Sequence, residues 1–208
     1  MASYHGPKAK MQRRFGELLV PRPKYQRILE KRQYPPGDHG QEKQFRAGRR
    51  SDFSMQLTEK QKLAFIYNIR EGQLRNYFKK ALQMSGRTGA NLLILLERRL
   101  DNVVYRSGFA ATIWAARQLV NHGHILVNGQ PLNLPAYQVK SGDVITIHPK
   151  MQKNVHVLEC LEQGVSAPPY LQIEPEKFAV TFLREPEQRD VPIPVDVQLV
   201  VEYYNRLL

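Results

Sequence analysis

The sequence predicts an α+β protein with a basic arm, a set of helices, a small antiparallel sheet and a closing helix. Two changes of pattern along the 208 residues support this prediction. Apolar residues recur at helical spacing between residues 58 and 121, and short strand-like runs separated by turn signals begin after Gly123.

Residues 1–50 are expected to form an extended arm that becomes ordered on a partner. Prolines and glycines interrupt every apolar run in this stretch, so that only short helical turns near residues 12–15 and 24–31 are expected. The arm holds 13 Lys and Arg against four acidic residues, while residues 164–208 are net negative. A surface that binds a polyanion explains this gradient, since each neutralised phosphate releases counterions. A solvated basic face without a partner is the alternative.

Four helices are expected after the arm. The stretch Thr58-Glu59-Lys60-Gln61 has the form of a capping box and predicts a helix from residue 58 to about 70. Apolar residues at i, i+3, i+4, i+7 and i+8 predict a second helix from Leu74 to Leu82, and a third is expected over residues 90–105. Thr112 is the expected N-cap of a fourth, which runs through Asn121.

The sheet is expected to begin with a hairpin, because a strand at residues 125–127 precedes Asn128-Gly129, a strong turn signal. Further strands are expected at residues 137–139, 144–147, 170–173 and 178–183, with a helix near 153–162 and a last one over 196–206.

Several classes of protein are excluded by composition and motifs. Cys160 is the single cysteine, so no intramolecular disulfide or multi-cysteine metal site is expected, and no apolar run approaches the roughly 20 residues of a membrane span. The start of the chain lacks the apolar core of a secretory signal. No phosphate-binding loop or His-Glu-x-x-His motif occurs, and His122 and His124 are expected to point to opposite faces. The sequence therefore predicts no enzyme, no metal, no cofactor and no small-molecule substrate.

Two polar faces on consecutive predicted helices favour RNA binding instead. Arg99, Asn102 and Arg106 fall at i, i+3 and i+7, and the next helix carries Trp114, Arg117 and Gln118 away from its apolar stripe. Side by side, such helices present guanidinium forks and an aromatic plane to a nucleic-acid backbone or an unstacked base. Ordinary amphipathicity with Trp114 half-buried in the core is the alternative.

The run Arg-Arg-Leu-Asp-Asn-Val-Val-Tyr-Arg-Ser-Gly-Phe at residues 98–109 resembles the signature of the small-subunit ribosomal protein S4 family. The order continues with Arg-Gln-Leu-Val at 117–120, His-Gly-His-Ile-Leu-Val-Asn-Gly at 122–129, Tyr-Gln-Val at 137–139 and Gly-Asp at 142–143. Motifs in the arm, such as Ser-Asp-Phe at 51–53, and the closing Val-Val-Glu-Tyr-Tyr at 200–204 extend the resemblance from end to end.

This resemblance implies a helical domain, residues 51–96 plus 177–208, interrupted by an RNA-binding module at residues 97–176. It implies a structural protein of the small ribosomal subunit that binds 16S-type rRNA early in assembly, at a junction in the 5′ domain. It also implies contact with ribosomal protein S5 and a basic loop, residues 43–50, beside the mRNA entry channel. Many members hold zinc through four N-terminal cysteines, which this chain lacks.

The expected location is the small subunit of a cytoplasmic ribosome, with an organellar ribosome as the alternative and no membrane partner. A stand-alone RNA chaperone and an RNA-modifying enzyme that uses the same module are the competing functions. The residues expected to contact RNA are Lys8, Lys10, Arg13, Arg14, Lys43, Arg46, Arg49, Arg50, Lys60, Lys62, Arg75, Lys79, Arg99, Asn102, Arg106, Trp114, Arg117 and Gln118.

Overall fold

A computed structural model describes residues 4–45, 51–164 and 167–207, without the side chains of residues 43–45. It is mixed helical with one small antiparallel sheet, which confirms the predicted fold class. The chain divides into two compact units, Met1–Arg75 with Pro194–Leu208 and Asn76–Ile193, and each is described by itself. The domain boundaries expected at residues 50, 96 and 176 stay a prediction. Within these described ranges, no helix has both the length and the apolar composition that crossing a membrane requires.

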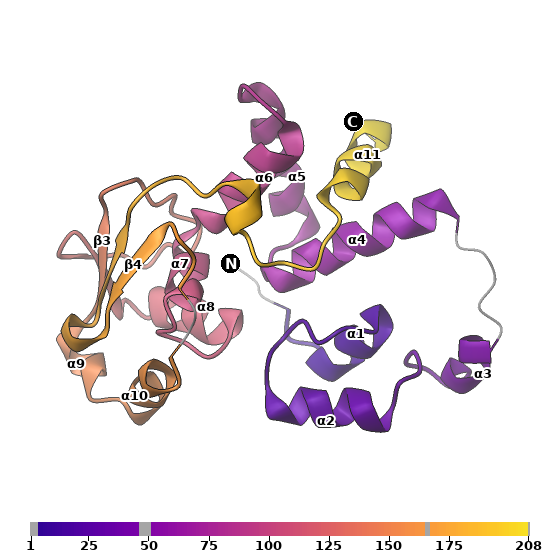
Figure 1. Ribbon diagram of the computed structural model, residues 1–208, viewed down its shortest axis with the longest axis horizontal. Coiled ribbons are helices and arrows are strands. Elements are labelled where there is room, and N and C mark those ends of the chain that lie inside the picture. Colours follow the sequence, from indigo (N-terminus) through magenta and orange to yellow (C-terminus); the bar gives the residue numbers. More distant parts are fainter. Residues whose placement is uncertain (1–3, 46–50, 165–166, 208) are drawn as a thin grey trace. The chain divides into compact units, whose positions relative to one another are not determined.

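The first unit, called unit 1, consists of helices. Its elements are α1 (Lys8–Phe15), α2 (Pro23–Lys31), α3 (Gly40–Phe45), α4 (Asp52–Ile66), the start of α5 (Glu71–Gln83) and α11 (Val197–Leu207). Helix α1 packs against α2, and α11 lies along α4 (Figure 1). The helices α1 and α2 give the arm more regular structure than the short turns that its sequence suggests.

Contacts between side chains hold α1 in unit 1. The Gln12 side chain is fully buried, and its Oε1 accepts a hydrogen bond of 3.1 Å from the Val20 amide. The rings of Phe15 and Phe65 lie 6.3 Å apart, and the Lys62 ammonium binds the Glu17 carboxylate at 2.8 Å. The arm around α1 is therefore packed against α4 in the free chain.

The helix predicted from Thr58 begins six residues earlier, at Asp52, so the capping-box prediction is wrong. Ser51 is the N-cap of α4 and accepts a hydrogen bond of 3.3 Å from the Ser54 amide. Thr58 lies inside the helix, where its hydroxyl donates to the Ser54 carbonyl at 2.7 Å. A Ser or Thr hydroxyl can serve either purpose, and the apolar period alone does not decide between them.

The second unit, called unit 2, places helices beside a five-stranded sheet. Its helices are the rest of α5, α6 (Thr88–Glu97), α7 (Leu100–Arg106), α8 (Ile113–Asn121), α9 (Pro149–Gln152) and α10 (Val155–Glu162), with short 3₁₀ turns η1 (Pro175–Lys177) and η2 (Gln188–Asp190). Thr112 caps α8 as predicted, since its hydroxyl accepts from the Ala115 amide at 3.2 Å.

The strands are β1 (Ile125–Val127), β2 (Gln130–Pro131), β3 (Val144–Ile147), β4 (Leu171–Glu174) and β5 (Ala179–Phe182), in the antiparallel order β2-β1-β3-β5-β4. The predicted hairpin is confirmed: Asn128 and Gly129 have φ values of 50° and 78°, as a tight hairpin turn requires. Of the strand expected at residues 137–139, the structure has only an isolated bridge between Gln138 and Arg99.

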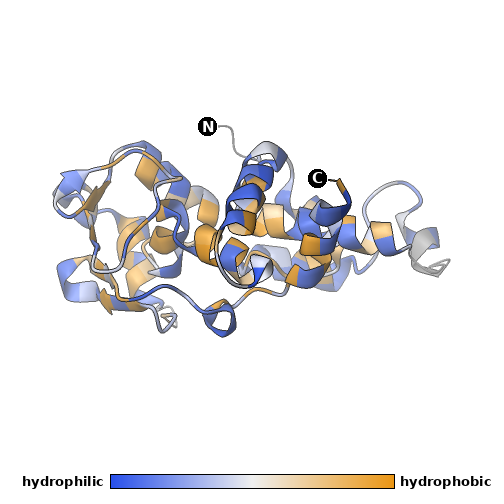
Figure 2. Ribbon diagram, turned by 90° about the horizontal axis from the view of Figure 1, so that it is seen from above, coloured by the Kyte–Doolittle hydropathy of each residue, from blue (hydrophilic) through white to orange (hydrophobic). Residues whose placement is uncertain are grey.

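The core of unit 2 joins α7 and α8 to the inner face of the sheet. Leu100, Val104 and Ala116 from the helices are buried with Ile125, Ile145 and Val180 from the strands. Hydrophilic and hydrophobic positions alternate around the helices in Figure 2, as in helices with one apolar face. The sheet and its core hold α7 and α8, the two helices that carry the predicted RNA-binding residues of the module.

Candidate nucleic-acid interface

The helix expected over residues 90–105 is broken, and the break determines where its arginines point. Helix α6 ends at Glu97, Arg99 is extended with φ −68° and ψ 135°, and α7 starts at Leu100. The Leu100 amide donates to the Tyr137 carbonyl at 2.9 Å, and the Val139 amide donates to the Arg98 carbonyl at 2.8 Å. This pairing with a segment about forty residues away replaces helical hydrogen bonds, so the prediction of one continuous helix is wrong.

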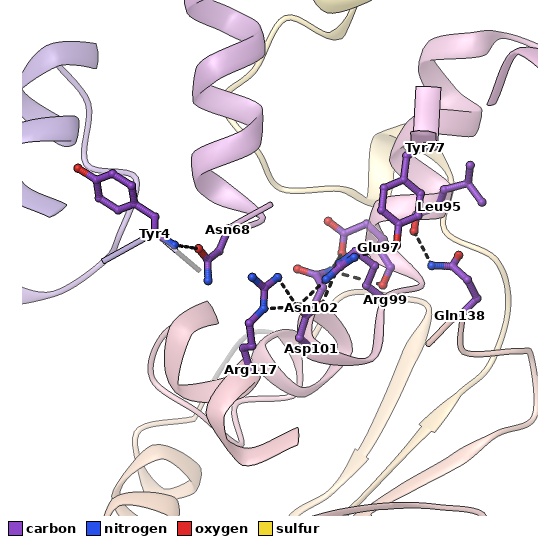
Figure 3. Close-up of polar contacts among 10 residues, drawn as sticks. All are labelled: Tyr4, Asn68, Tyr77, Leu95, Glu97, Arg99, Asp101, Asn102, Arg117 and Gln138. Atoms are coloured by element: carbon purple, nitrogen blue, oxygen red, sulfur yellow. Dashed lines mark hydrogen bonds and ion pairs between the residues drawn. The ribbon is translucent and has the colours of Figure 1, made fainter. Parts of the chain in front are cut away.

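Asp101, the second residue of α7, lies at the centre of a buried ion cluster next to this break. Its carboxylate is fully buried and accepts hydrogen bonds from Arg99 Nε at 3.0 Å and Nη2 at 2.8 Å. Arg117 of α8 reaches the same carboxylate through Nε at 2.9 Å and Nη2 at 2.6 Å. Figure 3 shows Asp101 between the two guanidinium groups. Arg99 Nη1 also donates a hydrogen bond of 2.7 Å to the Tyr77 hydroxyl. Asp101 thus ties the start of α7 to α8.

A second buried carboxylate, Glu97, organises the other side of α7. It accepts hydrogen bonds from Asn102 Nδ2, from Arg106 Nη2 at 2.9 Å and from the Tyr170 hydroxyl at 2.7 Å. Tyr170 directly precedes β4, so Glu97 links the end of α6 to α7 and to the sheet. Such charge-assisted hydrogen bonds are the strong class, and burial makes the loss of one partner costly.

Burial and neighbouring charges shift two pKa values in these clusters. Burial alone lowers the pKa of Arg99, but the charge and hydrogen bonds of Asp101, with those of Tyr77, raise it above its ordinary value. Burial raises the pKa of the Tyr170 hydroxyl, and the negative charge of Glu97 raises it further. Arg99 is therefore a permanent cation and Tyr170 a permanent donor at any physiological pH.

These contacts correct the expectation of an outward-facing guanidinium stripe. Arg99 is 1% exposed, Asn102 2% and Arg117 4%, because the buried carboxylates hold them inside unit 2. Arg106 is half-buried and bound to Glu97, Trp114 is half-buried, and Gln118 alone of the six is exposed. The i, i+3, i+7 spacing assumed a continuous helix, and it does not hold for Arg99, which is the extended residue before α7.

The predicted residues of unit 1 and α5 divide into buried and exposed cations. Lys60 and Lys62 are buried and bound to carboxylates, Lys60 to Glu71 at 2.6 Å. Lys8 and Arg13 are half-buried. The exposed members are Lys10, Arg14, Arg75 and Lys79. Arg46, Arg49 and Arg50 lie outside the described residues, as does the side chain of Lys43.

Sequence reasoning missed a row of cations on α2. Lys24, Arg27 and Lys31 fall at i, i+3 and i+7, are exposed, and have no ion pair among the contacts of the described residues. Arg22 and Arg32 flank the helix and are also exposed. Burial and the charge of Lys24 lower the pKa of Lys8, so α1 and α2 bring like charges together. The helical spacing was the available signal.

No group of three or more metal-binding side chains occurs where the structure describes the chain. The expectation that His122 and His124 point apart is wrong, since their rings lie 5.9 Å apart, edge to face. Helix α8 ends before His122, and Gly123 adopts a φ of 70°, so strand alternation does not apply to this turn. The absence of a resident metal stays a prediction.

Two family models match consecutive parts of the chain. Residues 3–97 match the "Ribosomal protein S4/S9 N-terminal domain", and residues 98–145 match the "S4 domain". The second match begins at Arg98, beside the break between α6 and α7, and ends within β3. It therefore covers the Asp101 cluster and the predicted hairpin.

Curated relatives match over almost the whole chain. The "Small ribosomal subunit protein uS4" of Chlorobium limicola is 44% identical over 99% of this chain and 100% of its own length. Its namesake in Roseiflexus castenholzii is 45% identical with the same coverage, and that of Ruegeria sp. strain TM1040 is 47% identical over 96% of each chain. These names confirm the resemblance and the prediction of a ribosomal protein rather than an enzyme.

Proposed function

The chain belongs to the uS4 family of small-subunit ribosomal proteins, and on this premise we propose that it is a structural component of the small ribosomal subunit that binds 16S-type rRNA directly. The observation that carries the proposal is the 43–47% identity to relatives named uS4 over nearly the full chain. The proposed setting is the cytoplasmic ribosome.

The exposed cations of α1 and α2 support this function. We define the cationic face as Lys10, Arg14, Arg22, Lys24, Arg27, Lys31 and Arg32, all of which are exposed. Each phosphate that such a residue neutralises adds about −0.7 to −0.9 to the slope of log affinity against log salt. Because A-form RNA hides its base edges in a deep groove, specificity would come from the shape of the RNA junction.

The proposal extends to three finer points of the family resemblance. The protein would bind a junction in the 5′ domain early in assembly, contact ribosomal protein S5, and place its basic loop beside the mRNA entry channel. The support for the last point is compositional, since residues 43–50 hold Lys43, Arg46, Arg49 and Arg50 without an acidic residue. Arg99, Asn102 and Arg117 take no part in the proposed surface, because they are buried.

A salt titration with two RNAs of equal length tests the proposal. One is a folded 5′-domain fragment of 16S-type rRNA and the other an unrelated structured RNA, each measured between about 50 and 200 mM salt. The expected result is much tighter binding to the first, with a steep salt slope on both. Equal affinity for the two would refute the ribosomal assignment and favour a stand-alone RNA chaperone.

A triple variant tests the cationic face within the same experiment. Replacing Lys24, Arg27 and Lys31 with Gln should reduce the salt slope by about two for three lost phosphate contacts. The matched control replaces Lys150 and Lys153 with Gln, two exposed lysines at α9 of unit 2. An unchanged slope in the triple variant would remove α2 from the RNA-binding surface.

A further inference from the structure

Arg13 of α1 binds the backbone of a distant segment instead of facing solvent. Its Nε donates to the Tyr34 carbonyl at 3.2 Å, and its Nη2 donates to the next carbonyl, that of Pro35, also at 3.2 Å. The guanidinium carbon lies 4.8 Å from the centre of the Tyr34 ring. One edge and one face of this side chain are thus occupied by residues 34 and 35.

The helix that carries Arg13 is itself fixed. Phe15 packs against Phe65 of α4, and the fully buried Gln12 side chain accepts a hydrogen bond from the Val20 amide. Glu17, just after α1, is bound by Lys62 at 2.8 Å. The arginine therefore extends from a rigid base in unit 1.

The segment that Arg13 holds leads into α3 and, in the sequence, toward the basic residues 43–50. Gly37 has a φ of 112°, and the Gly40 amide donates to the Gly37 carbonyl at 3.1 Å as α3 begins. A Cβ on Gly40 would lie 2.0 Å from the Pro35 oxygen, the same atom that Arg13 binds. Gly40 and Arg13 thus pack on the Pro35 carbonyl, and Gly40 lies three residues before Lys43, the first cation of residues 43–50.

We propose that Arg13 is a positioning residue, which holds residues 34–40 and thereby the start of α3, the helix that precedes Arg46, Arg49 and Arg50 in the sequence. This inference rests on the proposed RNA-binding function and changes the role expected for Arg13 from its sequence, a phosphate contact. A phosphate contact depends mainly on the positive charge, whereas two successive carbonyls and a ring require the planar fork of arginine. Replacing Arg13 with lysine therefore distinguishes the two roles, because lysine keeps the charge but not the planar fork.

The test compares Arg13→Lys with the control Arg14→Lys in the full chain. Both variants keep the net charge, and Arg14 is an exposed neighbour on the same helix. In the free protein, hydrogen exchange at the Gly40 amide should accelerate by about tenfold or more in Arg13→Lys, as expected when hydrogen bonds from a charged donor are lost. Arg14→Lys should leave this rate unchanged.

RNA binding provides the second measurement. Arg13→Lys should weaken binding of the 5′-domain fragment about fivefold to tenfold, while Arg14→Lys stays near wild type because a lysine still neutralises a phosphate. Gly40→Ala perturbs the same carbonyl from the other side and should reproduce both effects of Arg13→Lys. Far-UV circular dichroism shows whether each variant is folded.

The outcomes separate this inference from the function on which it rests. Unchanged Gly40 exchange in Arg13→Lys would overturn the positioning role, whatever the RNA result. Faster exchange with unchanged RNA affinity would overturn the claim that the position of α3 matters for RNA binding. If the wild-type protein does not prefer the 5′-domain fragment, the proposed function fails, while the exchange data still decide whether Arg13 holds the segment.

Discussion

Asp101→Asn should destabilise unit 2 severely, because one carboxylate neutralises two buried arginines. The substitution keeps the size of the side chain but removes the charge that Arg99 and Arg117 contact at 2.6 to 3.0 Å. Removal of one partner from a buried ion pair costs about 3–5 kcal/mol. Since domains of this kind are stable by about 5–15 kcal/mol, the loss is a large fraction of the total.

Thermal unfolding followed by circular dichroism measures this effect. At roughly 4 °C per kcal/mol, which lies between the values for smaller and larger domains, the melting temperature should fall by about 12–20 °C. The control is Glu185→Gln. Glu185 binds Arg98 at 2.6 Å but is 54% exposed, and such surface pairs contribute about 0–1 kcal/mol.

The reasoning fails if Asp101→Asn and Glu185→Gln melt at the same temperature. A further variant separates lost attraction from lost packing. Replacing Arg99 and Arg117 with Met and Asp101 with Leu removes all three charges together, and well-packed apolar residues often replace a buried ion cluster without loss. This triple variant should therefore melt above Asp101→Asn, although it has more substitutions.

Three other substitutions test single contacts in unit 2, each by the melting temperature. Tyr170→Phe should cost about 1–3 kcal/mol, because the buried Glu97 loses a donor at 2.7 Å. Asn128→Ala should cost a similar amount, since Asn128 has a positive φ and its side chain forms hydrogen bonds with Asp143 and with the Val144 amide. The control Asn133→Ala, at an exposed position, should leave the melting temperature unchanged. Burial and the charges of His122 and His148 lower the pKa of His124, so the unfolded chain takes up its proton first and stability should fall as the pH drops through about 6.5. His124→Gln should reduce this acid-side loss, and an identical pH profile would contradict the assignment.

The sequence predicted those elements that depend on interactions between residues close together in the chain. The Thr112 cap, the Asn128-Gly129 turn and the apolar period of α5 each depend on residues within one or two turns of the chain. Their elements appear where the sequence places them, and the antiparallel sheet follows from the short strand spacing.

The prediction of one helix over residues 90–105 failed because of contacts between distant residues. The break before Leu100 exists because the backbone at residues 98–100 pairs with residues 137–139, and nothing in the apolar period of residues 90–105 indicates this. The helix predicted to begin at Thr58 failed for a different, local reason, because Ser51 and Thr58 both suit an N-cap and the sequence pattern does not choose between them.

Contacts between distant residues also divide the predicted RNA-binding cations into two groups. One group is buried and bound to carboxylates, and the other is exposed. A sequence shows that an arginine is present, but its exposure depends on whether a carboxylate is buried within reach. Glu97 and Asp101 are the only acidic residues between Glu71 and Asp143, and the structure buries both beside the arginines of the motif. The arginines of the motif that carries the family resemblance therefore stabilise the fold of unit 2.

The two groups of cations respond to salt in different ways, and this links the architecture to the proposed function. Mobile ions screen charges in solvent over about 8–10 Å, whereas they reach a fully buried pair far less. Salt that weakens RNA binding by the cationic face therefore leaves the Asp101 cluster almost intact. In the proposed function, phosphate contacts of the cationic face would therefore change with salt while the module keeps its fold, because the cationic face and the Asp101 cluster consist of different arginines.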